Sequence, residues 1–238
     1  MVCKPIDLQK NDELIRYKRL REINKELNRS LVKSLGKPAI QKGGKDLGIL
    51  KRGALLFDRD DETSVFMDYC IHHLKIDNEA VVDRYIKLSS YDCVSDEATM
   101  LKAMSTSFFS VFIILDIEKD YICYVKDIMR EEEFIIIDTG MGQTRLPNLM
   151  IASQLMKIPL IDKYMTTGAP FTVANIKAVR GLEYIIRKNA ASVVDGVFIN
   201  NRNSSFAKQV VRMAFKTKCM RQTEYADAGP LISKIMNK

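Results

Sequence analysis

Apolar residues near the N-terminus recur every three or four positions, which is the spacing of one face of an α-helix. Over residues 8–36 these positions hold Leu14, Tyr17, Leu20, Ile23, Leu27, Leu31 and Leu35. The pattern predicts one long amphipathic helix that ends at Gly36. Because a helix in water is stabilised mainly by packing its apolar face, this stripe must be covered. Either the middle of the chain covers it, or a second subunit does so in a homodimer.

A glycine-rich segment separates this helix from the middle of the chain. Residues 37–53 contain four glycines and one proline, which predicts a loop or a short helix that could serve as a hinge. A short apolar strand is expected at residues 54–57. Three helices should follow, over residues 61–75, 77–88 and 95–107, with Ser95 as the N-terminal cap of the last.

The spacing of apolar residues then changes from helical to extended. Residues 108–117 are dense in Phe, Val and Ile, and with residues 121–128 they predict a β-hairpin. Further strands are expected at 134–137 and 149–158, and one strand or two short ones within 161–173. Five short strands joined by tight turns over about 65 residues are typical of a small antiparallel barrel or a strongly curved sheet.

Helical spacing returns after Val173. One helix is predicted to end near Asn189, and a basic helix follows over residues 204–220, whereas residues 192–200 fit either a strand or a helix start. Pro230 begins a last short helix. The predicted fold class is therefore α+β, with N-terminal helices, a central small antiparallel barrel-like sheet and a C-terminal helical segment.

Charge divides the chain into three blocks. The net charge is +7. Residues 1–53 are basic, with 14 Lys/Arg and 6 Asp/Glu, and residues 54–140 are acidic, with 8 Lys/Arg and 19 Asp/Glu. Residues 141–238 are basic again, with 15 Lys/Arg and 5 Asp/Glu. The basic blocks can bind an anionic partner, or they can dock on the acidic block. With the expected elements, this suggests a basic helix and hinge at 1–53, an acidic helical and barrel domain at 54–173, and a basic helical segment at 174–238.

Two of the expected helices carry basic residues at helical spacing. The candidate nucleic-acid-binding residues are Arg16, Arg19 and Arg29 on the first, and Lys208, Arg212 and Lys216 on the second. An i, i+4 ladder can follow a phosphate backbone, although a solvated helix face has the same pattern. We therefore expect a non-enzymatic binding module whose basic helices contact nucleic acid or a protein partner.

A metal-dependent hydrolase is the alternative. Asp68 and His72 are one helical turn apart and could bind a divalent metal together. A third ligand would have to come from elsewhere, and the candidates are Cys93, Asp60 and Asp61. A capping or hydrogen-bonding role for Asp68 explains the same residue without a metal, and we expect no cofactor.

Cysteine usage and hydropathy bear on the location of the protein. The five cysteines form no CxxC pair, so free thiols in a reducing compartment are expected. Cys70 and His73 could form a catalytic pair, but an apolar environment raises the pKa of a thiol and makes it unreactive. The chain has no apolar run long enough to span a membrane and no apolar signal segment, so we expect a cytoplasmic protein that does not contact a membrane.

Two loops at the ends of expected strands are rich in Gly, Thr and amides. They are TGMGQTR at residues 139–145 and MTTGAP at residues 165–170. Small barrels bind ligands at such loops. The candidate ligand-binding residues are Gln143, Arg145, Thr166 and Thr167, although tight turns that require glycine explain the same sequences.

Several segments resemble a family of uncharacterised bacterial proteins. The likeness starts with LGILKRGALLFDRDDETSVFMDYCIHHL (47–74) and continues through VDRYI (82–86), YVKDI (124–128), IIDTGMGQT (136–144) and MTTGAPF (165–171). It covers roughly residues 20–173. The resemblance supports the expected order of elements and implies a bacterial cytosolic protein, but the family has no established activity.

Overall fold

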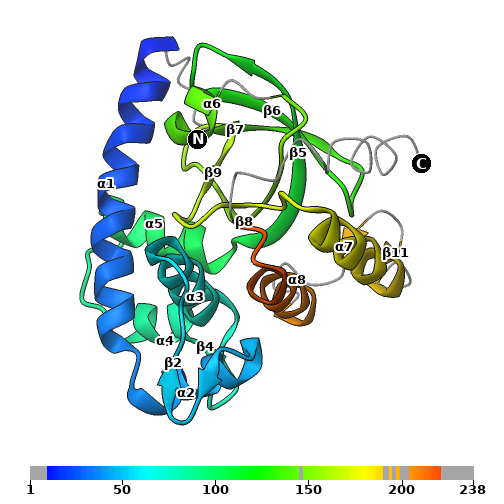
Figure 1. Ribbon diagram of the computed structural model, residues 1–238. Coiled ribbons are helices and arrows are strands. Elements are labelled where there is room, and N and C mark those ends of the chain that lie inside the picture. The colour runs from blue at the N-terminus through cyan, green and yellow to red at the C-terminus, as the bar shows by residue number, and fades with distance from the viewer. Residues whose placement is uncertain (1–9, 145–146, 190–192, 195–196, 199–203, 221–238) are drawn as a thin grey trace.

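The computed structural model describes residues 10–144, 147–189, 193–194, 197–198 and 204–220 (Figure 1). The helices are α1 (Lys10–Ser34), α2 (Lys37–Leu47), α3 (Asp60–His73), α4 (Val81–Leu88), α5 (Asp96–Ser105), α6 (Thr139–Thr144), α7 (Ile176–Asn189) and α8 (Ser204–Thr217). The strands are β1 (Leu50–Lys51), β2 (Ala54–Leu55), β3 (Lys75–Ile76), β4 (Glu79–Ala80), β5 (Phe108–Glu118), β6 (Ile122–Asp127), β7 (Glu133–Ile137), β8 (Met150–Lys157), β9 (Tyr164–Thr166), β10 (Phe171–Thr172), β11 (Val193–Val194) and β12 (Val197–Phe198).

A five-stranded barrel forms the upper part of the molecule in Figure 1. The strands pair in the order β8, β5, β6, β7 and β9, and β9 also pairs with β8, which closes the barrel. β10 pairs with the other edge of β8. The predicted α+β class is confirmed, with one difference. β7 and β9 pair in parallel, with Ile136 opposite Tyr164, so the barrel is mixed rather than wholly antiparallel.

Apolar side chains fill the inside of the barrel. The interior cluster consists of Phe112, Ile114, Cys123, Val125, Ile136, Met141, Leu149, Ile151 and Leu155. The first half of β5 is buried on both faces, because helices cover the outside of the barrel there. This explains why the sequence of β5 is a continuous apolar run rather than an alternation of apolar and polar residues.

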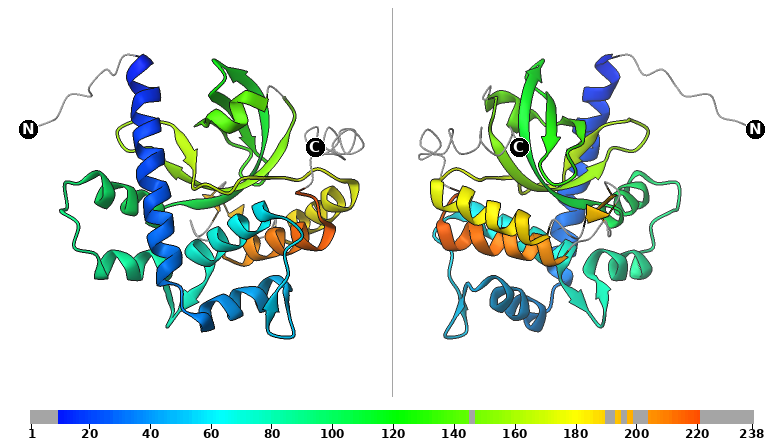
Figure 2. Two further views of the ribbon diagram at one scale, coloured as in Figure 1. Left: turned by 60° about the vertical axis from the view of Figure 1, so that its left-hand side comes forward. Right: turned by 90° about the vertical axis from the view of Figure 1, so that its right-hand side faces the viewer.

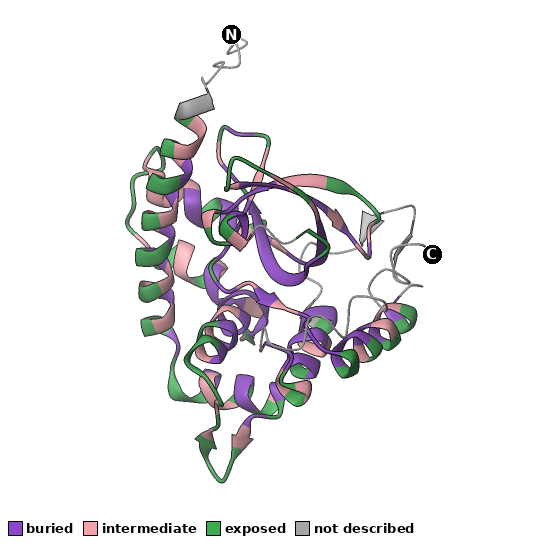
Figure 3. Ribbon diagram, turned by 45° about the horizontal axis from the view of Figure 1, so that its top comes forward, coloured by how far each residue is buried: buried purple, intermediate pink, exposed green. Residues whose placement is uncertain are grey.

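A second and larger core lies between the barrel and the helices. α1 runs along one side of the molecule and contacts α3, α4 and α5, while α8 packs against α2, α3 and α7 (Figure 2). Leu20, Leu27 and Leu31 of α1 are buried, and the opposite side of the helix is exposed (Figure 3). The acidic middle of the chain therefore covers the predicted apolar stripe. A homodimer through α1 stays a prediction, and it would have to use another face of the helix.

The glycine-rich segment after α1 contains a helix, α2. Pro38 lies in its first turn and Gly48 ends it in the left-handed region with φ 76°. A Cβ atom on Gly43 would lie 2.6 Å from Cys70 Sγ of α3. The glycine at position 43 thus permits close packing of two helices, which the sequence pattern alone does not distinguish from a loop.

Two other expectations differ from the observed elements. The segment after β7, expected as a break, contains the short helix α6. There Gly142 is required, because a Cβ atom would lie 2.2 Å from the Asp120 carbonyl oxygen. The ambiguous segment 192–200 includes β11 and β12, which pair antiparallel. The short helix expected at Pro230 lies outside the described residues, and no described helix is long and apolar enough to cross a membrane.

Candidate functional site

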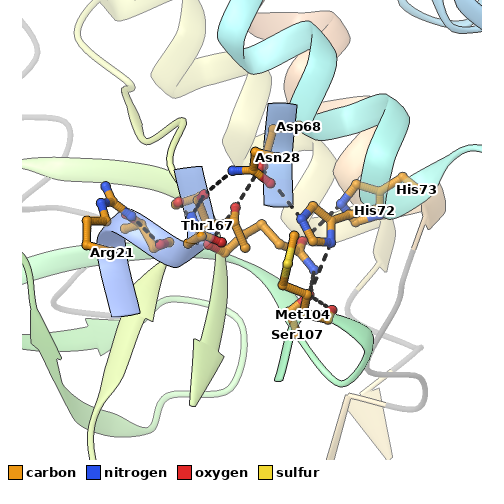
Figure 4. Close-up of polar contacts among 12 residues, drawn as sticks. Arg21, Asn28, Asp68, His72, His73, Met104, Ser107 and Thr167 are labelled. Atoms are coloured by element: carbon orange, nitrogen blue, oxygen red, sulfur yellow. Dashed lines mark hydrogen bonds and ion pairs between the residues drawn. The ribbon is translucent and has the colours of Figure 1, made fainter. Parts of the chain in front are cut away.

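One face of α1 holds the loop that follows β9. Arg21 donates a hydrogen bond from Nη1 to the Thr166 carbonyl oxygen at 2.6 Å. Asn24 and Asn28 both donate from Nδ2 to the Thr167 carbonyl oxygen, at 2.6 and 2.9 Å (Figure 4). Because steps of three and four residues place side chains on the same face of a helix, these three side chains together fix the loop beside α1.

Asp138 joins the same loop to the barrel. It follows β7 and is buried, and its Oδ2 accepts a hydrogen bond from Thr166 Oγ1 at 3.0 Å. The Arg21 guanidinium lies 3.7 Å from the same oxygen, and Oδ1 accepts from the Met141 backbone N–H at 3.0 Å. Burial, and then the Asp138 charge, raise the pKa of the nearby Tyr17 hydroxyl. The Asp138 carboxylate therefore accepts hydrogen bonds from Thr166 and Met141 and lies beside the Arg21 guanidinium, and these contacts orient the loop.

Two adjoining cavities open between α1 and the loop at residues 168–170. One, of about 690 Å³, is bounded on the barrel side by residues 138–141. The other, of about 530 Å³, is bounded by residues of α3. Both are lined by Arg21, Lys25 and Gly168, so together they form one groove, called the α1 groove below. Their volumes are in the range of small-ligand sites.

A row of basic residues lines the α1 groove. Its members are Lys18, Arg21, Lys25, Arg29 and Lys33. They follow one helix face over about 22 Å. Lys25 pairs with Glu22 at 2.6 Å and Arg29 pairs with Glu26, but both pairs are solvent-exposed and such pairs contribute at most about 1 kcal/mol. Within the described part of the chain, Lys18 and Lys33 make no ion pair. An anionic ligand can therefore compete for this row.

The other predicted nucleic-acid-binding residues of α1 are paired within the molecule. Arg16 and Arg19 lie 3.0 and 2.6 Å from the Asp96 carboxylate at the start of α5. Of the predicted set on this helix, only Arg29 lines the groove. Part of the first basic block thus docks on the acidic block, as charge complementarity predicts.

The basic ladder of α8 is also divided. Lys208 forms an ion pair with Asp46 of α2 at 2.6 Å. Arg212 and Lys216 line a separate cavity of about 600 Å³ beside β1. The ladder therefore holds one structural cation and two cations near a cavity, and its role in binding stays a prediction.

The two predicted ligand loops are brought together at the α1 groove. Residues 139–141 of one and Gly168 of the other line the barrel-side cavity. Thr167 lines the α3-side cavity. Thr166 and Thr167 are both fully buried and hydrogen-bonded to Asp138 and Asp68, respectively. Gln143 is exposed at the end of α6, and Arg145 lies outside the described residues. Of the candidate ligand-binding residues that the structure describes, Thr167 therefore lines the groove, whereas Gln143 and Thr166 do not.

Asp68 and His72 of α3 lie close together, as the metal hypothesis requires. Asp68 Oδ1 is 3.7 Å from His72 Nε2, and the same oxygen accepts a hydrogen bond from Thr167 Oγ1 at 2.7 Å (Figure 4). Among the described residues no group of three His, Cys, Asp or Glu side chains could hold a metal ion. Asp60, Asp61 and Cys93 are exposed. The hydrogen-bonding role of Asp68 is confirmed, and the hydrolase stays a prediction without a third ligand.

His73 is hydrogen-bonded within the core, in a chain that includes Gln154 and Ser107. Gln154 donates from Nε2 to Ser107 Oγ at 2.7 Å. Its Oε1, 3.0 Å from His73 Nε2, can only accept, so the proton lies on that ring nitrogen (Figure 4). Burial raises the pKa of the neighbouring Cys70 thiol to about 12. A reactive Cys70–His73 pair is therefore not formed.

Asp68 is expected to make stability depend on pH. Its side chain is 12% exposed, and burial raises its pKa from 3.8 to about 7, against the lowering effects of the Thr167 hydrogen bond and Arg21. Between these values the folded protein keeps a proton that the unfolded chain releases, so the free energy of unfolding falls as pH rises. Asp68→Asn cannot ionise and should not lose this stability. Its unfolding free energy should therefore rise relative to that of wild type as pH increases from about 4 to about 8, by up to about 4 kcal/mol in total.

Urea unfolding of both proteins across this pH range measures the difference. The exposed Asp61→Asn, on the same helix, is the matched control and should follow wild type. A constant difference between Asp68→Asn and wild type would show that Asp68 ionises at its ordinary pKa.

Comparison with known proteins adds one match. The model of a family of unknown function (DUF7986) matches residues 11–178. No curated protein and no solved structure matches the chain. All residues that line the α1 groove fall within the matched region, whereas α8 falls outside it.

Proposed function

The chain belongs to this family of unknown function, and we propose that it is a non-enzymatic binding module that holds single-stranded nucleic acid in the α1 groove. One observation carries the proposal. The cations from Lys18 to Lys33 form a row along two adjoining cavities. Neutralising phosphates with such a row supplies the sequence-independent part of nucleic-acid affinity.

The cavities favour a single strand over a duplex. In a duplex the bases are paired and stacked inside, so only phosphates could contact the groove. In a single strand the unpaired bases can turn away from the backbone and enter neighbouring cavities. Cations four residues apart on α1 lie about 6 Å apart along the axis, which is comparable to the distance between phosphates of an extended strand.

The α1 groove is a better candidate than α8 for the main contact. Lys208, the first member of the α8 ladder, is paired with Asp46. On α1, by contrast, only Arg21 of the groove-lining cations is held by a buried carboxylate of the described chain, that of Asp138. Lys25 and Arg29 have weak exposed pairs, and Lys18 and Lys33 have none with a described residue. A phosphate would thus meet a smaller competing interaction at α1.

Removing three of these cations tests the proposal. The variant Lys18→Gln, Lys25→Gln, Arg29→Gln should bind a fluorescent single strand of about ten nucleotides roughly 100-fold more weakly at about 0.1 M salt. The slope of log K against log salt should become shallower by about 2, because each phosphate contact contributes about 0.7 for single strands. Fluorescence anisotropy at several salt concentrations measures both quantities.

The matched control removes the same charge elsewhere. Lys177→Gln, Arg180→Gln, Lys188→Gln changes three exposed cations of α7, and it should keep affinity within about threefold of wild type because long-range attraction is screened. Equal weakening by both variants would show that only the net charge matters. No binding by wild type at low salt, with retention of an acidic peptide instead, would make a protein the partner and overturn the proposal.

A further inference from the structure

Two asparagines that line the α3-side cavity of the groove each have an amide oxygen without a hydrogen-bond partner among the described residues. They are Asn24 and Asn28, and Asn24 is 1% exposed. The Oδ1 atoms of both are buried and accept no hydrogen bond from the described chain. The orientation of both amides is determined, because each Nδ2 donates to the Thr167 carbonyl oxygen. Turning either amide would bring two acceptor oxygens together.

Buried acceptors without donors cost free energy, which a suitable ligand would recover. Two such oxygens one helical turn apart form a site for a group with more than one N–H. Asn24 is the more deeply buried of the two asparagines, and the flexible side chains of Met67 and Arg29 line the same cavity. Small movements of these two side chains would let a donor reach the amides.

The rest of the cavity suits a flat ring joined to a phosphate. Val32, Met67 and Ile71 give it apolar walls. Lys25, Arg29 and Lys33 supply cations. Its volume of about 530 Å³ is sufficient for one nucleotide. Apolar walls, adjacent cations and unpaired acceptors are the three features that a nucleotide would use.

We infer that this cavity is a pocket for one base of the bound strand and that it selects a base with an exocyclic amino group. The inference rests on the proposed function and deepens it. Adenine, cytosine and guanine each have an amino group with two hydrogens, which can donate to both amide oxygens. The only ring N–H of thymine lies between two carbonyl oxygens, so a second amide oxygen would meet another acceptor.

Homopolymers test the selection with the wild-type protein alone. Single strands of oligo(dA), oligo(dC) and oligo(dT), each of about ten nucleotides, compete for the same labelled mixed-sequence strand at low salt. Oligo(dA) and oligo(dC) should bind about 10-fold more tightly than oligo(dT). Because one purine and one pyrimidine with an amino group are compared, a preference that comes from purine stacking alone would favour oligo(dA) only, and it would contradict the inference.

A variant assigns the preference to the amides. Asn28→Leu keeps the approximate shape of the side chain but also removes the hydrogen bond to the Thr167 carbonyl oxygen. The readout is therefore the ratio of affinities, and the preference for oligo(dA) and oligo(dC) over oligo(dT) should largely disappear. Gln209→Leu, the same kind of change on α8, should keep the wild-type preference.

Three outcomes decide the inference. Loss of preference in Asn28→Leu alone supports it. Equal binding of all three homopolymers by wild type, with weakening by the α1 charge variant, overturns the base pocket but keeps the proposed function. Absence of binding to every homopolymer at low salt overturns both.

Discussion

Replacing Leu27 with Asp is expected to cost more than about 4 kcal/mol of unfolding free energy. Leu27 is 1% exposed and belongs to the core between α1 and the helices α3, α4 and α5. The change removes a large apolar side chain and places a carboxylate in an apolar core. We expect a protein that is unfolded, or only partly folded, at room temperature, as measured by urea unfolding and circular dichroism.

Ile15→Asp is the matched control, since it makes a similar change on the exposed side of the same helix. Ile15 is 65% exposed, so its replacement should change stability by less than about 0.5 kcal/mol. If Leu27→Asp melts like wild type, α1 does not pack on the rest of the chain as described. If it stays folded but its mass by light scattering is halved, the stripe serves a homodimer instead.

Replacing Asp127 with Ala is expected to cost about 3–5 kcal/mol. Asp127 is fully buried at the end of β6. Its carboxylate accepts hydrogen bonds from Ser110 Oγ at 2.7 Å, from the backbone N–H groups of Met129 and Arg130 at 2.7 and 2.8 Å, and from Arg130 Nη1 at 2.7 Å. Without the carboxylate, the Arg130 side chain, 13% exposed, loses its ion pair. The turn between β6 and β7 also loses its internal acceptor.

Asp116→Ala on the neighbouring strand β5 is the control, because it removes a carboxylate that is exposed and not buried. Asp116 is exposed, and the described hydrogen bond of its side chain is to the next backbone N–H, so a change below about 0.5 kcal/mol is expected. Thermal and urea unfolding of the two variants give the comparison. A cost below about 1 kcal/mol for Asp127→Ala would mean that the buried network contributes little to stability.

Local sequence patterns predicted most elements of the fold. α1, α3, α5, β5, β6 and β8 lie close to their expected positions because each combines a clear apolar period with a recognisable end, such as the Ser95 cap of α5. The helices α6 and α2 were harder to predict from the sequence, because their glycines permit close packing against distant segments and do not mark turns. The parallel β7–β9 pair was not predictable either. It depends on how the barrel closes, not on the composition of the two strands.

The candidate site was less predictable than the fold. The loops at 139–145 and 165–170 were identified from their composition, and the structure brings them together at the groove. The roles of Asn24 and Asn28 were missed, although both lie on the α1 face that also carries Arg21. A polar residue within an otherwise apolar face was the available signal. Charge spacing could not separate Arg16 and Arg19, which pair with Asp96, from the cations that line the groove.

The central claim is that nucleic acid lies along α1, and lysine footprinting tests it most directly. The protein is treated with an acetylating reagent, with and without a saturating single-stranded oligonucleotide at low salt, and modification of each lysine is measured by mass spectrometry. Lys18, Lys25 and Lys33 are expected to become protected, while Lys177 and Lys188 of α7 react as before. Protection confined to Lys208 and Lys216 of α8, with α1 unchanged, would contradict it.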